Sequence, residues 1–535
     1  MLAQNGKSLF GKLFGDDDTR CVGKARLHHG RSCTRLTYRL RSLGSISALA
    51  LAFVVPLAIY VASLQSGVDF WDIGELQTVP YILGIAHPTG FPVYVLTGWA
   101  WSHLVPFGDP AYRMNLLSAV AMSAAAIALA GALLELAVAP VAACGAALVF
   151  AVTRVPWDHA VHADVHPLAL AAVTAGFWAA LRWVRTGSGR ALMACAAAAA
   201  LALAVHSGMV LVVPGVLVAA LGRRPELRRA AVCAAAGTLI VVGAYAYLPL
   251  RSAVVYAQRL DPTLALGLPP GRPFWDADHP STWAGFRAEV GGGEFGAVHA
   301  LSRLADPAVL RTLPANYGKA AVGDLAGGVL LIALVGIVAV VRRVPAAGLG
   351  IIAGSLLPVL FVLAYPAESD PERYFLPSYW AIALFLGAGA DLLARGGLAV
   401  APRALTLVVG GLMLFVVGTD VAANRGAFFT GHDDSAQRFI DRVVRETPPD
   451  AIVVAPWAYA TPLAYAAYVQ NRLGRRIVVT GWPEDYAAYY PAWLANRPIT
   501  FVSDDPVINV PGVRVREPRL LTPAPHLFSA LAALR

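Results

Sequence analysis

The sequence predicts an all-α polytopic membrane protein with about eleven transmembrane helices and a small C-terminal soluble α/β domain. Of its 535 residues 57% are hydrophobic and only 14% are charged, and the mean hydropathy is +0.60. Apolar runs of this extent exceed what a soluble core can bury. We divide the chain into a basic cytoplasmic tail (1–44), a transmembrane region (45–420) and an extracytoplasmic α/β domain (421–535).

The first apolar run, 45–64, has the length of about 20 residues that a bilayer crossing needs. Basic residues precede it from Arg20 to Arg41, so we expect a signal anchor with a cytoplasmic N-terminus. A cleaved signal peptide is the alternative. The later apolar runs lie at 115–137, 140–153, 166–184, 191–205, 208–221, 230–248, 322–341, 347–364, 378–394 and 404–419.

The arginine-rich connectors between these runs set the predicted orientation. Because successive spans cross the membrane in alternating directions, all of these connectors lie in the cytoplasm if the short run 91–107 is a re-entrant or interfacial helix. The alternative is that this run spans the membrane and an extra crossing elsewhere restores parity. In the favoured topology the acidic and histidine-containing loops share the outer face, which predicts a site at the outer membrane surface.

The net charge of +9 is explained by these topology signals, so we expect no nucleic-acid partner. The five cysteines show no spacing typical of a disulfide framework or a zinc site. The segment after residue 420 alternates helical and strand-like runs. It has no GxGxxG or P-loop, and we interpret it as a packing or acceptor-recruiting module.

The first outer loop contains "DFWDIGELQTVPYILGIAHPTGFPVY". Asp69, Asp72 and Glu75 stand at i, i+3 and i+6, so on a helix they share a face and raise one another's pKa, which suits a general base. A solvated acidic loop is the alternative. His87 lies in a rigid Pro/Gly elbow before an apolar helix, where it is either a capping or a site residue.

The second outer loop, "TRVPWDHAVHADVHPLAL", carries Asp164 and His166 among further histidines and carboxylates. Histidine and carboxylate at this density could form a metal site, but we do not predict one because no HxxxH or HExxH pairing on a clear helix supports it. Asp164 also suits the cap of the next helix.

Two arginines are expected at the outer interface, against the positive-inside trend. "YLPLRSA" places Arg251 at the exit of a span, and "YPAESDPERYFLPSY" places Asp370, Arg373 and Tyr374 in a short loop. Each arginine either binds an anion or extends its head group to the membrane surface.

The motifs "DIGEL", "GIAHPTGFPVY", "RMNLLSA", "ADVH", "AVHSG", "YLPLRS" and "DPERYFLPSY" occur in this order. Together they resemble a large family of multi-spanning membrane proteins that includes a vertebrate transmembrane protein O-mannosyltransferase. The likeness covers roughly residues 45 to 395. The family pattern is similar to GT-C glycosyltransferases, in which a carboxylate of the first outer loop faces a polyprenyl-phosphate-linked sugar. The resemblance therefore implies a GT-C-like fold.

The resemblance assigns Asp72 and Glu75 to the family's D-x-G-E motif and His87 to its H-P-P-G motif. It also assigns Asp370, Arg373 and Tyr374 to a D-x-E-x-Y-like segment. This chain departs from the pattern at Thr89, where a second proline is usual, at Asp164, where glutamate is common, and at His166, where tyrosine is common. These departures leave the sugar or acceptor preference open.

The resemblance, together with these residues, implies an inverting glycosyltransferase that takes a sugar from a polyprenyl-phosphate donor to a protein or glycan hydroxyl, and the composition suggests a bacterial inner membrane. Asp72 is the expected base and Glu75 its catalytic partner. Arg251 and Arg373 are the expected phosphate ligands. We expect substrate contacts from Asp69, His87, Asp164, His166, Asp370 and Tyr374, and no required cofactor. A polytopic transporter and a non-catalytic sugar-lipid-binding scaffold are the alternatives.

Overall fold

The computed structural model describes residues 30–292, 327–364, 371–396, 402–429, 433–503 and 519–521, with isolated positions from 303 to 311. The basic segment before residue 30 and the predicted site residue Asp370 lie outside the described residues.

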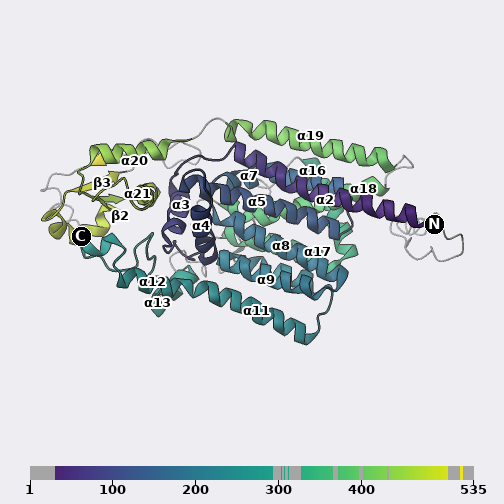
Figure 1. Cartoon of the computed structure of the whole chain (residues 1–535), viewed down its shortest axis with the longest axis horizontal. Coiled ribbons are helices and arrows are strands. Elements are labelled where there is room, and N and C mark those ends of the chain that lie inside the picture. Colours follow the sequence, from purple (N-terminus) through teal and green to yellow (C-terminus); the bar gives the residue numbers. More distant parts are fainter. Residues whose placement is uncertain are drawn as a thin grey trace.

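A bundle of long apolar helices forms one part of an elongated molecule, and a small sheet domain lies beyond one end of it (Figure 1). Within the described residues, each predicted apolar run is largely helical. The bundle helices are α2 (Gly30–Ala62), α5 (Pro110–Glu135), α6 (Pro140–Val152), α8 (Val165–Thr186), α9 (Gly189–Val205), η1 (Ser207–Leu211), α10 (Val213–Ala220), α11 (Leu227–Tyr245), α16 (Gly327–Arg343), α17 (Pro345–Ala364), α18 (Leu376–Gly396) and α19 (Pro402–Phe428).

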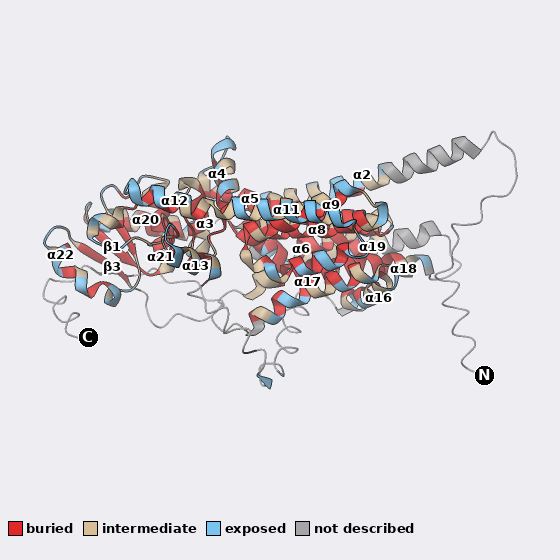
Figure 2. Cartoon of the chain, turned by 90° about the horizontal axis from the view of Figure 1, so that it is seen from below, coloured by how far each residue is buried: buried red, intermediate tan, exposed pale blue. Residues whose placement is uncertain are grey.

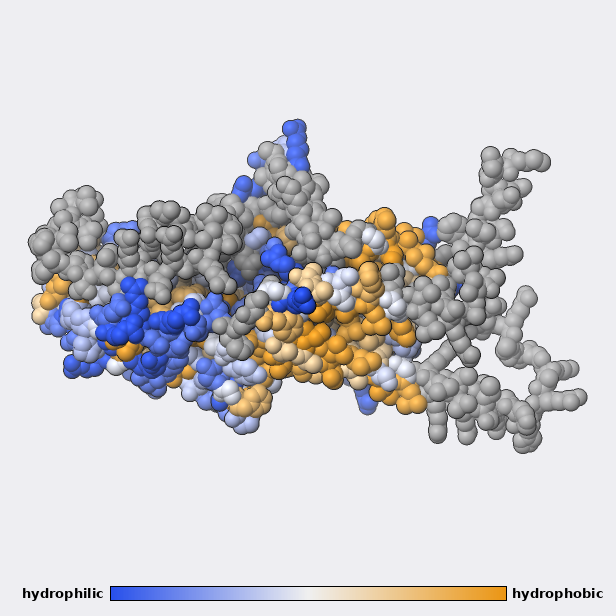
Figure 3. Space-filling view, turned by 90° about the horizontal axis from the view of Figure 1, so that it is seen from above, coloured by the Kyte–Doolittle hydropathy of each residue, from blue (hydrophilic) through white to orange (hydrophobic). Residues whose placement is uncertain are grey.

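The bundle carries an apolar outer surface. Large hydrophobic side chains such as Leu239, Leu331 and Phe415 are exposed on its outer helices, and Figure 3 shows apolar residues over the bundle and hydrophilic ones over the sheet domain. Such a belt suits a lipid environment. By length and composition, six helical segments of the described chain can cross a membrane, or seven if the bent pair α6 and α7 (Arg154–Val161) is one span.

The prediction of about eleven spans also counted apolar helices too short to pass that test. Within the described residues, Gly189–Val205 and Ser207–Ala220 are shorter apolar segments of this kind. These helices still pack within the bundle, α9 against α8 and α10 against α17, and Figure 2 colours residues along the bundle's inner faces as buried. The multi-pass, mainly helical architecture is confirmed, whereas within the described part of the chain fewer than eleven helices meet the length criterion.

The basic connectors and the polar loops lie at opposite ends of the bundle. At one end, Glu135 accepts hydrogen bonds from Arg182, at 3.4 Å, and from Arg185. At the other end, the Gln65 backbone N–H donates to the Val161 carbonyl at 3.2 Å.

The run expected to be re-entrant or interfacial forms α4 (Pro92–Leu104), a helix of 13 residues. At 1.5 Å per residue it extends only about 20 Å, short of a hydrocarbon core of about 30 Å. It packs beside α3 (Trp71–Ile82) and α5. The polar end of the molecule also contains α12 (Tyr247–Ala257), η2 (Pro262–Leu266) and α13 (Trp283–Gly291).

The C-terminal part contains the alternating helices and strands that the sequence predicts. They are α20 (Ser435–Glu446), β1 (Ile452–Ala455), α21 (Trp457–Tyr468), β2 (Ile477–Thr480), η5 (Pro483–Tyr489), α22 (Tyr490–Leu494), β3 (Ile499–Ser503) and β4 (Arg519–Leu521). The strand order is β2-β1-β3-β4, with β1 parallel to β2 and β3 and with β4 antiparallel to β3. β1 is buried along its whole length, as expected for a central parallel strand.

Candidate active site

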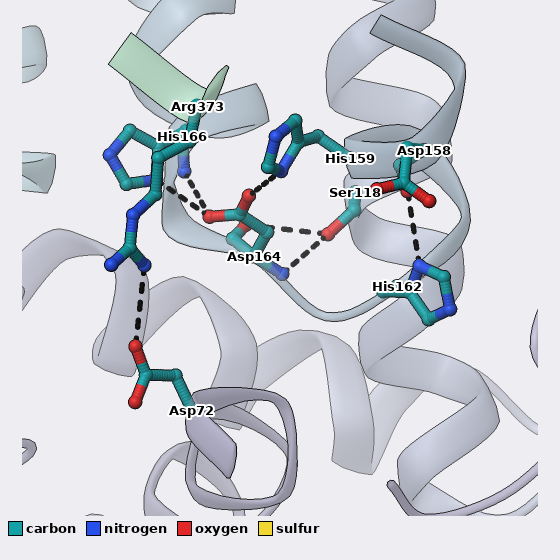
Figure 4. A network of polar contacts seen from close by, with 8 residues as sticks. All are labelled: Asp72, Ser118, Asp158, His159, His162, Asp164, His166 and Arg373. Carbon is teal, nitrogen blue, oxygen red and sulfur yellow. Dashed lines mark hydrogen bonds and ion pairs between the residues drawn. The ribbon is translucent and has the colours of Figure 1, made fainter. Parts of the chain in front are cut away.

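Three segments far apart in the sequence meet at Asp72. This residue lies in the first turn of α3, where the helix dipole favours a negative charge. Its Oδ2 accepts a hydrogen bond from Nη1 of Arg373, in η4 (Pro371–Phe375), at 3.3 Å. Its Oδ1 accepts one from Nε1 of Trp457, at the start of α21, at 2.8 Å. Figure 4 shows the Arg373 side chain pointing to Asp72.

The surroundings keep Asp72 ionised. Burial raises its pKa, but the charges of His87 and Arg373 and the hydrogen bonds from Trp457 and Arg373 outweigh burial and hold the pKa below its usual value. The expectation that neighbouring carboxylates raise this pKa is therefore wrong, because cations are the nearer charges. The Asp72 side chain is 32% exposed, so an incoming hydroxyl can reach it.

Glu75 is enclosed, in contrast, and its side chain is fully buried. Its Oε1 accepts a hydrogen bond from the His87 backbone N–H at 2.7 Å, and its Oε2 contacts Nδ1 of the same residue. Burial lowers the pKa of His87, but the Glu75 carboxylate and then Asp72 overcome this effect and raise it to about 9. His87 is therefore a site cation at neutral pH.

The elbow that places His87 depends on Gly90. The Gly90 backbone N–H closes a turn onto the His87 carbonyl at 2.9 Å, and its φ of +77° favours glycine. A Cβ at this position would lie 2.8 Å from Oε1 of Glu289 and 2.9 Å from Cδ2 of Leu248. The elbow is thus fitted closely against α13 and α12.

The second predicted loop supplies a buried carboxylate with two histidines. Asp164 caps α8, because its carboxylate accepts a hydrogen bond from the His166 backbone N–H at 2.8 Å. The same carboxylate contacts Nδ1 of His159 at 2.7 Å and Nδ1 of His166 at 2.8 Å (Figure 4). Burial raises the pKa of Asp164, but the two histidines lower it well below its usual value.

His166 extends this network toward the Arg373 loop. Its ring lies 4.9 Å from that of His206 and 5.5 Å from that of Tyr374, measured between centroids. Nε2 of His166 is buried and has no hydrogen-bond partner among the described residues. A buried imidazole nitrogen of this kind is suited to a polar group of a substrate.

Asp69 does not share the face of Asp72 and Glu75, because α3 begins at Trp71 and Asp69 precedes it. Its Oδ1 accepts a hydrogen bond from the Phe70 backbone N–H at 2.8 Å. Burial raises its pKa, and the charge acting most strongly on it is that of His162. Asp69 therefore precedes the helix that carries Asp72 and Glu75, and a charge of the second loop acts on it.

Arg251 is also placed away from Asp72. Its guanidinium donates to the carbonyl oxygens of Leu83, at 2.5 Å from Nε, and Ile82, at 3.2 Å from Nη2. The Tyr247 hydroxyl donates to the next carbonyl, Gly84, at 2.8 Å. Together they satisfy the C-terminal carbonyls of α3, where a positive charge is favourable.

Sequence reasoning overlooked Trp457 and gave His159 no site role. Trp457 follows the carboxyl end of the central parallel strand β1. Polar crevices in α/β sheets lie at such strand ends, so this position was a usable signal. Among the described residues, no group of three His, Cys, Asp or Glu side chains is arranged to hold a metal ion.

Comparison with known proteins relates the first part of the chain to one family. Residues 72–228 match the model of the protein O-mannosyl-transferase TMEM260 N-terminal domain. Protein O-mannosyl-transferase TMEM260 of Mus musculus is 32% identical over 125 residues, which are 23% of this chain and 18% of that relative. The chain thus spans less than a fifth of the length of this relative.

Two solved structures match this chain over most of its length at low sequence identity. The Archaeoglobus fulgidus oligosaccharyltransferase, in complex with Zn and sulfate, matches with a TM-score of 0.51 at 11% identity, over 84% of this chain and 68% of its own. ArnT from Cupriavidus metallidurans bound to undecaprenyl phosphate has a TM-score of 0.49 at 12% identity, over 88% of this chain and 97% of its own. The first likeness confirms the predicted GT-C-like fold. Residues 72–228, which include Asp72, Glu75, His87, Asp164 and His166, are similar to the N-terminal domain of the TMEM260 family, which confirms over that segment the resemblance carried by the motifs.

Proposed function

We propose that this chain is an inverting membrane glycosyltransferase that moves a sugar from a polyprenyl-phosphate carrier to a hydroxyl group of a protein or glycan. The observation that carries the proposal is the ionised, partly exposed Asp72 carboxylate held beside the Arg373 guanidinium at the polar end of the bundle. The similarity of residues 72–228 to proteins named protein O-mannosyl-transferase supports it.

Different residues act on the acceptor and on the leaving group. Asp72 takes the proton from the acceptor hydroxyl as the oxygen attacks the anomeric carbon. The bond from that carbon to the phosphate oxygen breaks, and the lipid phosphate leaves with the electron pair. Arg373 binds this phosphate, because a guanidinium offers paired donors to its oxygens. His87, with its pKa raised to about 9, adds a second positive charge nearby.

Further contacts orient the sugar. His166 is held by Asp164 through Nδ1, so Nε2 is presented in a fixed direction to a sugar hydroxyl. A single displacement by one base inverts the anomeric configuration, by analogy with glycoside hydrolysis. We propose that no divalent cation is required, because the donor has no pyrophosphate to bridge. In the proposed orientation, the reaction takes place at the outer face of a bacterial inner membrane.

The test is sugar transfer by the purified full-length protein in liposomes. The probes are polyprenyl-phosphate [14C]mannose and a Ser/Thr-containing peptide, with and without EDTA. We expect EDTA-resistant labelling of the peptide and a product anomer opposite to that of the donor. The absence of transfer from mannosyl and other polyprenyl-phosphate donors, with unchanged lipid-linked sugars and glycoproteins in a deletion strain, would overturn the proposal.

A further inference from the structure

The C-terminal domain is seated directly on the segment that carries the proposed base. A Cβ on Gly74, in α3, would lie 2.9 Å from Oγ1 and 3.1 Å from the carbonyl carbon of Thr461, in α21. The backbone N–H of Ala111 donates to the Tyr465 hydroxyl oxygen at 3.0 Å. Glycine at position 74 therefore permits a close approach of α21 to α3.

Trp457 is the residue through which this domain reaches the site. Its indole stacks on Phe274, with ring centroids 5.7 Å apart and an interplanar angle of 6°. It meets the His87 ring edge to face at 6.0 Å and 88°. These neighbours fix the plane of the indole, so Nε1 is directed at Oδ1 of Asp72.

The two oxygens of Asp72 have different partners. Arg373 binds Oδ2 and Trp457 binds Oδ1. A lipid phosphate carries more negative charge than a carboxylate and competes for the guanidinium, which weakens the bond to Oδ2. The indole N–H is neutral, so the phosphate competes for it less strongly than for the guanidinium, and its hydrogen bond to Oδ1 is kept. Asp72 then keeps its direction while Oδ2 becomes available for the acceptor proton.

We propose that Trp457 is a positioning residue for Asp72, and that the C-terminal domain is thereby a structural part of the active site. The inference rests on the proposed function and assigns the domain a role beyond packing or acceptor recruitment. It also accounts for a hydrogen bond between residues 385 positions apart. The lowered pKa of Asp72, to which this hydrogen bond contributes, agrees with it.

The test compares two tryptophans of the same domain. Trp457→Phe keeps an aromatic ring on Phe274 and removes the N–H. Trp493→Phe is the matched control, because Nε1 of Trp493 donates to the Leu266 carbonyl at the same distance of 2.8 Å but lies on no site carboxylate. We expect Trp457→Phe to lower kcat about 10- to 100-fold, the range for a hydrogen bond to a charged group, with the donor KM nearly unchanged.

The pH profile separates positioning from folding. A hydrogen bond to the ionised carboxylate lowers its pKa, so Trp457→Phe is expected to move the acidic limb of kcat/KM to higher pH. Trp493→Phe is expected to leave the limb in place. If Trp457→Phe and Trp493→Phe had equal kcat values and equal acidic limbs of kcat/KM, the inference would be overturned. Transfer by the wild type would still uphold the proposed function in that case.

A measurement without turnover keeps the two questions apart. The infrared band of the protonated Asp72 carboxyl, identified by its loss in Asp72→Asn, should appear at higher pH in Trp457→Phe than in the wild type. If Trp457→Phe does not fold, 3-benzothienylalanine at position 457 replaces N–H by sulfur and keeps the ring shape. A carboxyl titration identical to that of the wild type would refute the role of Trp457. A shifted titration in a protein without transfer would instead count only against the proposed function.

Discussion

Glu75 and His87 form a closed pair in which one carboxylate receives both the backbone N–H and the ring nitrogen Nδ1 of the histidine. Glu75 is fully buried, and 20% of the His87 side chain is exposed. Because the pair raises the pKa of His87 to about 9, the histidine carries its charge in the folded protein at pH values where an ordinary histidine is neutral.

The pair predicts a pH-dependent contribution to stability. The folded-state pKa of His87 lies above its unfolded value of about 6.5, so the stabilisation is complete below that pH and is lost as the pH rises through about 9. We expect the thermal midpoint of the purified protein to fall across this window, and to fall less in Glu75→Gln. Glu226→Gln, at the exposed pair with Arg229, is the control and should follow the wild type. A wild-type midpoint independent of pH in this window would contradict the prediction.

Asp72→Asn should separate chemistry from folding. Asparagine keeps the shape and still accepts hydrogen bonds from Arg373 and Trp457, but it does not take the acceptor proton. We expect transfer to fall roughly 10²- to 10⁴-fold, about 3 to 5 kcal/mol of barrier, in the liposome assay, with normal membrane insertion.

Asp69→Asn is the comparison for this change, since Asp69 lies before α3, whereas Asp72 is the carboxylate that accepts the hydrogen bond from Arg373. It should retain far more activity than Asp72→Asn. Near-normal transfer by Asp72→Asn, with loss in Asp69→Asn or Asp164→Asn, would move the role of base to another carboxylate.

The two outer arginines should respond differently to substitution. Arg373→Lys keeps the charge but not the planar fork, so donor KM should rise and transfer fall. Arg251→Lys removes donors from the carbonyls of Ile82 and Leu83, so we expect a lower thermal midpoint with donor KM preserved. Equal donor KM for Arg, Lys and Gln at position 373 would argue against phosphate binding there.

The topology can be tested with single cysteines in a cysteine-free background. Positions 66 and 107 are exposed and lie before and after α4, and position 224 is exposed in a basic connector. An impermeant maleimide added outside should label Ser66→Cys and Phe107→Cys but not Arg224→Cys. Opposite labelling of positions 66 and 107 would show that α4 crosses the membrane.

Much of the fold follows from the sequence because apolar runs and strand-like runs are local signals. The motif residues Asp72, Glu75 and His87 were also found locally, and they do lie together. Trp457 was missed as a partner of Asp72, because a contact across 385 residues leaves no local periodicity. Arg251 and Arg373 look alike in sequence, and only their hydrogen-bond acceptors distinguish them. Arg251 donates to two backbone carbonyls, whereas Arg373 donates to a carboxylate.

The close approach of α21 to α3 has a consequence for biogenesis. The membrane helices leave the ribosome first, and in the proposed orientation the segment that carries Trp457 is made later and crosses the bilayer before it folds. During that interval Asp72 and Arg373 face each other without the indole. Under the proposed function, a newly inserted chain would have its phosphate-binding arginine in place before Asp72 is fully positioned, and export of the C-terminal domain would decide when each molecule becomes active.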